Sequence, residues 1–229
     1  MEQKSLRADA DAAIVAYNKM EGYIVQEELL TILKTKYPDH KNKMGVDIKV
    51  KLLNLFYSTG IQATNAMTNH IMKIKDIDKR LGEGDLSLVE EIAALKLKNN
   101  TTRYNYSFAT KYCAYHQPDK FPIYDSIVAK TFVSLFNKGL LPKFKLGKKT
   151  AEDQNIFAKS DFNKKLKDYN FFVKLYQYFI EIYDLQKFPF RKVDTYIWGA
   201  FKIAGPDYEI EKMAQLDKSK IAQYIIEED

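Results

Sequence analysis

The sequence predicts an all-α protein, and three observations point to that class. Apolar residues recur at helical spacing along most of the 229 residues. No stretch alternates apolar and polar residues for long enough to indicate a series of strands, and no unit repeats along the chain. Hydrophobic residues make up 46% of the chain and charged residues 29%, which is the balance of a globular protein with a sizeable core.

The first half reads as helices separated by short breaks. We expect, in order, an amphipathic segment at 8–20 and helices at 25–37, 46–58 and 61–74. The helix at 25–37 ends before Pro38, and Gly60 separates the helices at 46–58 and 61–74. Another helix opens at Asp85 or Ser87, with acidic residues in its first turn. Residues 99–102 form a polar break.

The second half continues the pattern. We expect helices at 106–116, 126–137 and 171–185, a turn at 117–120, a basic loop at 143–149, a last core element at 193–203 and an amphipathic C-terminal helix at 209–226. The segment 171–185 carries aromatic residues on nearly every face, which predicts a central buried helix. A short hairpin within 187–195 stays open as an alternative. Trp198 lies in an apolar run, which favours the core over a stacking role.

The motifs of several classes of enzyme are absent from the chain. The chain has no phosphate loop, dinucleotide fingerprint, nucleophile elbow or HExxH metal pair. Its single cysteine, Cys113, lies mid-helix among aromatic residues and favours a core role, while three widely spaced histidines indicate no metal site. We therefore expect neither cofactor nor metal. No apolar run is long enough to span a membrane, and the N-terminus lacks a signal peptide's apolar core, so a cytoplasmic protein is the simplest interpretation.

The formal net charge of +6 is concentrated in one segment. Residues 138–170 hold nine lysines and four acidic residues, a local net charge of +5. A basic patch suits a phosphate backbone, which binds through the release of counterions. A solvated lysine-rich loop explains the same composition, and the sequence leaves both interpretations open.

Residues 106–130 carry the most informative pattern. A helix leads through a proline-containing break to Asp125, which stands where the next helix begins. A carboxylate at that position can cap the free backbone N–H groups of the helix. The carboxylate can also face a cleft and take part in catalysis. Both roles are open from the residues alone.

Here the chain resembles a known family. Residues 107–130, SFATKYCAYHQPDKFPIYDSIVAK, look like the end of the helix-hairpin-helix DNA glycosylase core, where a proline-containing turn leads to an aspartate that opens a helix. Residues 53–61, LNLFYSTGI, are similar to that family's base-pocket helix, and 194–198, DTYIW, to a later element. The nearest resemblance is to a bacterial group similar to 8-oxoguanine DNA glycosylase.

The resemblance implies a single helical domain over 1–229, with a glycosylase-like core at 46–203 and helical extensions at 1–45 and 204–229. It implies that the protein flips a modified base out of double-stranded DNA and cleaves its glycosidic bond. Asp125 would stabilise the positive charge that develops on the sugar. The family's catalytic lysine position falls near Tyr106, so Lys111, 14 residues before Asp125, is the candidate amine.

The resemblance also implies binding residues. The base-pocket candidates are Asn54, Tyr57, Ser58, Thr59 and Tyr124. The nucleic-acid contacts are Arg103, Asn105, Ser107, Ser126, Lys143, Lys145, Lys148 and Lys149. Residues 100–105 lack the family's glycines, so Arg103 and Asn105 would contact phosphate through their side chains. The alternatives are a non-catalytic nucleic-acid-binding module of the same fold and a helical protein-interaction domain.

Overall fold

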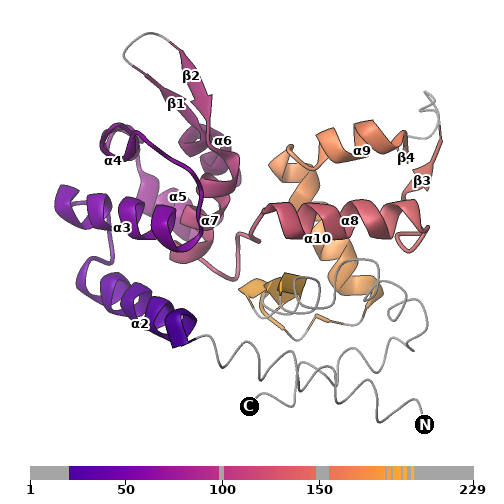
Figure 1. The fold of residues 1–229 in the computed structure, drawn as a ribbon, viewed down its shortest axis with the longest axis horizontal. Helices are drawn as coiled ribbons and strands as arrows, with labels where there is room; N and C mark the ends of the chain where they lie inside the picture. Colours follow the sequence, from indigo (N-terminus) through magenta and orange to yellow (C-terminus); the bar gives the residue numbers. More distant parts are fainter. Residues whose placement is uncertain are drawn as a thin grey trace. The chain divides into compact units, whose positions relative to one another are not determined.

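The computed structural model describes residues 21–97, 101–147 and 155–183, followed by 185–186, 188–191, 193–194 and 197–198. Figure 1 shows a chain that is mostly helical, with two small two-stranded sheets. The predicted all-α class is therefore confirmed. None of the described helices is long and apolar enough to cross a membrane. The predicted segments 8–20 and 209–226 lie outside the described residues.

The described residues fall into two compact units. We call residues 21–124 the N-terminal unit and the described residues from 125 onward the C-terminal unit. Each unit has a buried core of its own. The prediction of a single domain stays a prediction, because compactness does not establish whether either unit folds alone.

The N-terminal unit is built from six helices and a hairpin. In order these are α2 (Glu21–Lys36), α3 (Lys43–Phe56), α4 (Thr64–Ile71), α5 (Ile77–Glu83), α6 (Ser87–Ala93), β1 (Ala94–Lys96), β2 (Thr102–Tyr104) and α7 (Tyr106–His116). Helix α3 begins where the Asn42 side chain accepts hydrogen bonds from the backbone N–H groups of Met44 and Gly45, at 2.9 and 3.1 Å. A Cβ at Gly45 would lie 2.6 Å from the Tyr37 ring, so glycine permits this close approach.

The C-terminal unit contains α8 (Ser126–Asn137), β3 (Lys145–Leu146), β4 (Ile156–Phe157), α9 (Lys159–Lys165) and α10 (Tyr169–Ile182). Its core is aromatic. The Phe132 ring of α8 meets Phe172, Tyr176 and Phe179 of α10 edge to face, with ring centroids 5.5–6.0 Å apart. These contacts fix α10 against α8, the helix that Asp125 opens.

The structure corrects three sequence predictions in this unit. Helix α10 is buried along one side only, because Asn170, Lys174, Gln177 and Glu181 form an exposed stripe at helical spacing. The basic loop at 143–149 includes strand β3, which pairs in parallel with β4. The described residues within 187–195 form no hairpin, and Phe190, Arg191, Val193 and Asp194 are helical.

Two further corrections concern the N-terminal unit. The helix predicted at 61–74 is shorter, running from Thr64 to Ile71, because residues 57–63 form a loop. The polar break at 99–102 lies at a hairpin, in which Leu95 pairs with Arg103 and Lys96 with Thr102. No alternating pattern marks this hairpin in the sequence, because each strand is only three residues long.

Candidate functional site

Asp125 occupies the N-cap of α8, as the sequence predicts. Its backbone is extended, and its Oδ1 atom accepts hydrogen bonds from the N–H groups of Ile127 and Val128, each at 2.9 Å. Both cap bonds use this one oxygen of the half-buried carboxylate. The capping role is therefore established, and the catalytic role stays a prediction.

Lys111 is a buried amine on α7. The residue is 6% exposed, and its Nζ atom donates to the Ser107 hydroxyl at 3.0 Å, one helical turn earlier. The same Nζ lies 5.4 Å from the centre of the Tyr57 ring, a favourable cation–π distance. The structure thus brings together three predicted site residues, although Tyr57 and Lys111 are 54 positions apart in the sequence.

Tyr124 packs against α7, the helix that carries Lys111. Its backbone N–H donates to the Thr110 hydroxyl at 3.2 Å, and its ring lies 4.7 Å from the Tyr106 ring. The segment just before it is also buried, at Phe121, Pro122 and Ile123. These contacts fix the path of the backbone that leads to Asp125. Asp125 follows Tyr124 directly in the chain.

Asn54, a predicted pocket residue, organises the loop after α3. Its Oδ1 atom accepts from the Thr59 hydroxyl at 2.7 Å and from the Ile61 N–H at 2.8 Å, while its Nδ2 donates to the Ile61 carbonyl at 3.0 Å. Both oxygen lone pairs are therefore used, which leaves one amide hydrogen for a ligand. The loop also holds Ser58 and Gly60 at positive φ, 48° and 74°.

We expect Asn54→Ala to destabilise the protein by about 2 kcal/mol, because it leaves the buried Ile61 N–H without its acceptor and frees a loop with left-handed residues. Urea denaturation measures the change. Leu55→Ala is the matched control, since Leu55 is 68% exposed on the same helix and its loss is expected to cost less than about 0.5 kcal/mol. Equal effects of the two substitutions would contradict the organising role.

The predicted nucleic-acid contacts divide between the two units. In the N-terminal unit, the exposed Arg103 donates from Nη1 to the Gln62 side chain at 3.5 Å, and Asn105 donates to the Arg103 carbonyl at 3.3 Å. In the C-terminal unit, Ser126, Lys143 and Lys145 are exposed. Lys148 and Lys149 lie outside the described residues. All these contacts stay predictions.

A buried polar cluster, which we call the histidine cluster, joins four parts of the N-terminal unit. The His40 Nδ1 atom lies 2.6 Å from the Asp78 carboxylate, and its Nε2 lies 2.9 Å from the Tyr112 hydroxyl. The His116 ring lies 4.7 Å from the His40 ring, and its buried Nε2 atom has no hydrogen-bond partner. Lys49, which is fully buried, donates from Nζ to the Asp39 carbonyl at 3.1 Å.

Burial governs ionisation in the histidine cluster. Desolvation lowers the pKa of His40 in spite of the opposing Asp78 carboxylate. Desolvation, reinforced by the positive charge of Lys49, holds the pKa of His116 well below its usual value. Burial also lowers the pKa of Lys49 to about 8. The cluster therefore favours neutral imidazoles.

The sequence did not predict this cluster, because its histidines are widely spaced along the chain. The structure buries the His116 ring beside His40 and Lys49. Cys113, on the same helix, is fully buried as expected, and burial raises the pKa of its thiol. Among the described residues, no group of three histidine, cysteine, aspartate or glutamate side chains could hold a metal ion.

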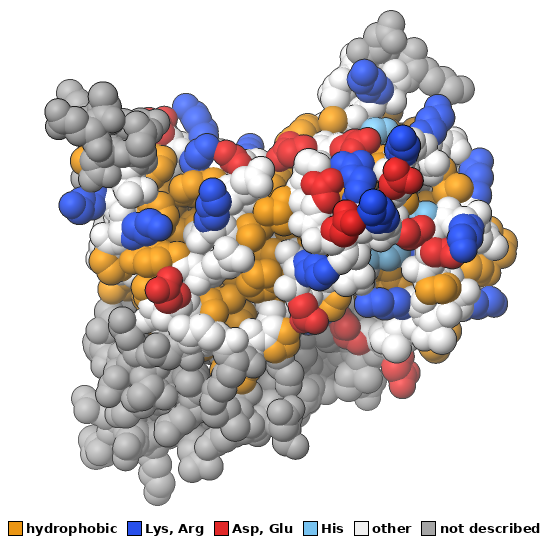
Figure 2. Space-filling model, turned by 180° about the vertical axis from the view of Figure 1, so that it is seen from behind, with side chains coloured by type: hydrophobic (Ala, Val, Ile, Leu, Met, Phe, Trp, Pro, Cys, Tyr) orange, Lys and Arg blue, Asp and Glu red, His pale blue; other side chains and the backbone are white. Residues whose placement is uncertain are grey.

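Surface charges near the histidines are paired. Arg80 of α5 donates to the Asp85 carboxylate at 2.8 Å and to the Glu91 carboxylate at 2.7 Å. Figure 2 shows acidic and basic side chains interleaved on the surface around the histidines. This face therefore presents no patch of one sign that would attract a phosphate backbone.

Asp194, from the last element of the resemblance, lies inside the C-terminal unit. It is buried and accepts a hydrogen bond from the Tyr176 hydroxyl at 2.6 Å. Burial and the nearby Asp194 charge raise the pKa of Tyr176 well above its usual value. Trp198 is half-buried in the helical segment that follows. Asp194 thus ties this segment to α10.

Comparison with known proteins finds a family model that matches most of the N-terminal unit and a relative of similar sequence. Residues 9–120 match a family model described as "N-terminal domain" (HI_0787_N). An uncharacterized protein of Haemophilus influenzae (strain ATCC 51907 / DSM 11121 / KW20 / Rd) is 37% identical over 149 residues, which cover 65% of this chain. The match spans 62% of the relative's length. No solved structure matches the chain.

The end of the family match agrees with the division of the structure. The match stops at residue 120, and the boundary between the two units falls after Tyr124. The region that the family model matches therefore includes Lys111, Tyr57 and the histidine cluster, and it ends before Asp125. The similarity to the Haemophilus influenzae protein covers more of the chain, 149 residues in all.

Proposed function

We propose that this protein is a DNA glycosylase-like protein that removes a modified base from DNA. The observation that carries the proposal is the contact of Lys111 with Tyr57 and Ser107. A buried amine beside an aromatic ring and a hydroxyl is a suitable group for attack on a sugar carbon. Asp125 supplies the carboxylate, and its catalytic use is compatible with the cap because the cap engages Oδ1 alone.

The proposed reaction needs few groups. The bond between the sugar C1′ and the base nitrogen breaks, and its electron pair leaves with the base. The Asp125 carboxylate stabilises the positive charge on the sugar. Water then adds to C1′ and gives its proton to the Asp125 carboxylate, which passes it to the departing base, and an abasic sugar remains. Where the deprotonated Lys111 amine attacks C1′ instead, an N–C1′ bond replaces the bond to the base. The C1′–O4′ bond then opens, the amine proton moves to O4′, and the resulting Schiff base is reduced and trapped by a hydride reagent.

An abasic-site assay tests the proposal on duplexes that carry oxidised, alkylated, deaminated or hypermodified bases. We expect abasic product from at least one duplex and none from the unmodified control. Borohydride treatment separates the two nucleophiles, because a covalent adduct that Lys111→Gln fails to form assigns the amine as the attacking group. Absence of abasic product across the panel would contradict glycosylase activity.

A non-catalytic nucleic-acid-binding module is the second candidate. It is favoured by the structural tasks that both catalytic candidates already perform, since Asp125 caps α8 and Lys111 bonds to Ser107. DNA binding without abasic product in the same assay would select it. A protein-interaction domain is favoured by an exposed apolar stripe on α2, formed by Val25, Leu29 and Ile32. Absence of DNA binding would select that function.

A further inference from the structure

The hairpin of β1 and β2 presents one face to solvent. In an antiparallel pair, opposed residues lie on the same face of the ribbon. Tyr104 therefore shares a face with Ala94, and Lys96 shares it with Thr102. The other face holds Leu95, which is 1% exposed, so that face turns toward the core of the unit. Tyr104, Lys96 and Thr102 consequently lie on the outward face, and all three are exposed.

Tyr104 is an exposed aromatic side chain with a fixed position. Its ring is half exposed, with 50% of the residue accessible. The ring lies nearly parallel to that of Tyr106, with an angle of 10° and centroids 6.0 Å apart. Its hydroxyl donates to the Glu90 carboxylate. A ring held at both ends loses little conformational entropy when a ligand stacks on it.

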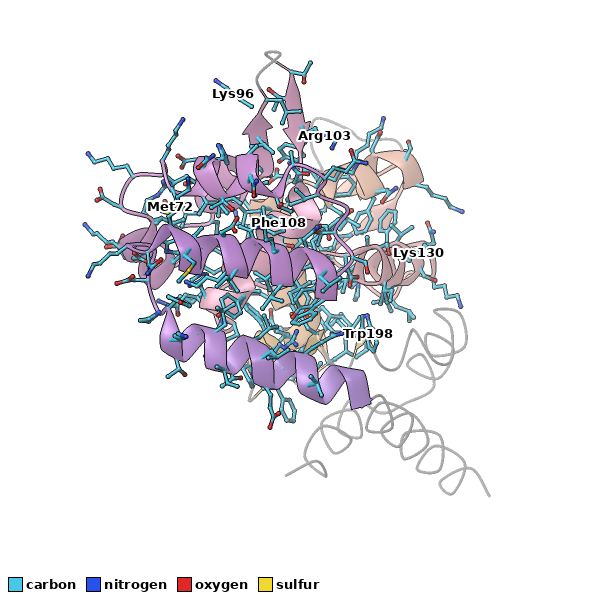
Figure 3. All side chains as sticks on the ribbon, turned by 60° about the vertical axis from the view of Figure 1, so that its left-hand side comes forward. Met72, Lys96, Arg103, Phe108, Lys130 and Trp198 are labelled. Atoms are coloured by element: carbon cyan, nitrogen blue, oxygen red, sulfur yellow. The ribbon has the colours of Figure 1, made fainter. Side chains whose placement is uncertain are left out.

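One cation, Lys96, shares the outward face of the hairpin with the Tyr104 ring. Residues 92–118 contain four lysine or arginine residues and no acidic residue. Figure 3 shows Lys96 and Arg103 on the hairpin. Within the described part of the chain, Lys96 has no ion pair. Arg103 lies on the opposite face, paired with Leu95, and donates to the neutral Gln62 side chain. Glu90 is the nearby acid, and the Tyr104 hydroxyl donates to it.

We infer that Tyr104 is a stacking platform for an unpaired nucleobase, with Lys96 on the same face of the hairpin holding the flanking phosphate. Aromatic rings bind bases of any sequence by stacking, and cations beside them follow the backbone. This inference rests on the proposed function, which requires that the protein binds nucleic acid. It adds that the hairpin binds a single strand with unpaired bases. Tyr104 has no place in the proposed cleavage chemistry.

Fluorescence anisotropy of the full chain on two single strands tests the inference. One strand is a labelled thymidine tract, and the other is a base-free tract of equal length and charge. We expect the wild-type protein to bind the thymidine tract ~5-fold or more tightly than the base-free tract. Tyr104→Leu should remove this difference, whereas Tyr104→Phe should keep it because the ring remains. Lys96→Gln should weaken binding to both strands alike.

The outcomes separate the two proposals. Equal binding of the wild-type protein to the two tracts would overturn the stacking platform and leave the proposed function standing. Retention of the preference by Tyr104→Leu would do the same. Failure of the wild-type protein to bind either tract or any duplex would overturn the proposed function together with the platform.

Discussion

Replacing Asp125 with asparagine is expected to reduce base release by about 10²- to 10³-fold while α8 stays folded. Asparagine caps helices about as well as aspartate, so the bonds from Ile127 and Val128 to Oδ1 are retained. The substitution therefore removes the negative charge alone. The loss should appear in the single-turnover rate of abasic-site formation, since in the proposed reaction that charge stabilises the transition state and not the bound duplex.

Asp125→Ala is the companion variant, because it removes both the charge and the cap. We expect it to lose activity as Asp125→Asn does, and in addition to lower the free energy of unfolding by about 1 kcal/mol. A change in stability for alanine alone, with activity lost in both variants, separates the two roles. Full activity of Asp125→Asn would assign Asp125 to capping only.

The start of α8 was predictable because its signals are local. A proline-containing strap, an aspartate and an apolar helical stripe lie within a few residues of one another, and each limits the backbone in the same place. Helix α10 was predicted in position for the same reason. Its exposed stripe was overlooked because aromatic side chains dominate the composition and conceal four polar residues at helical spacing.

The contacts of the candidate site depend on tertiary packing. Lys111 and Tyr57 were named from separate motifs, and no local pattern predicts that one would lie over the other. Asn54 was expected to contact a base, whereas three of its hydrogen bonds close its own loop. Side chains that serve a turn and those that bind a ligand are of the same types, so the sequence does not separate them.

The histidine cluster was unpredictable for a related reason. His40 contacts Asp78, 38 residues away, and Tyr112, 72 residues away. None of these residues belongs to a spacing motif, and two of the chain's three histidines become buried only when α3, α5 and α7 pack together. The cluster has a measurable consequence. Because its imidazoles are buried in their neutral form, the free energy of unfolding depends on pH.

Acidification below about pH 6.5 is expected to destabilise the N-terminal unit before the C-terminal unit. The unfolded chain protonates its imidazoles near pH 6.5, whereas His40 and His116 in the folded chain protonate only at lower pH. The unfolded state therefore binds more protons in this window, and the free energy of unfolding falls as the pH falls. Two such groups give a slope of up to about 2.7 kcal/mol per pH unit.

The groups that face His116 act in the same direction. Lys49 of α3, Lys34 of α2 and His40 are cationic or become so, and each opposes a charge on His116. The neighbouring rings of Tyr112 and Tyr115 supply no negative charge, because burial raises the pKa of both hydroxyls. Protonation of His116 thus costs free energy in the fold with no acidic partner to offset it.

Hydrogen exchange followed by mass spectrometry measures this loss unit by unit between pH 7 and pH 5.5. Peptides from α7 should lose protection steeply after correction for intrinsic exchange rates, while peptides from α10 serve as the internal control, since all three histidines precede residue 117. His116→Phe keeps a ring at that position and should reduce the slope for α7 by about half. An unchanged slope in that variant would assign the acid sensitivity to other groups, whereas an equal loss in α10 would show that the two units unfold together.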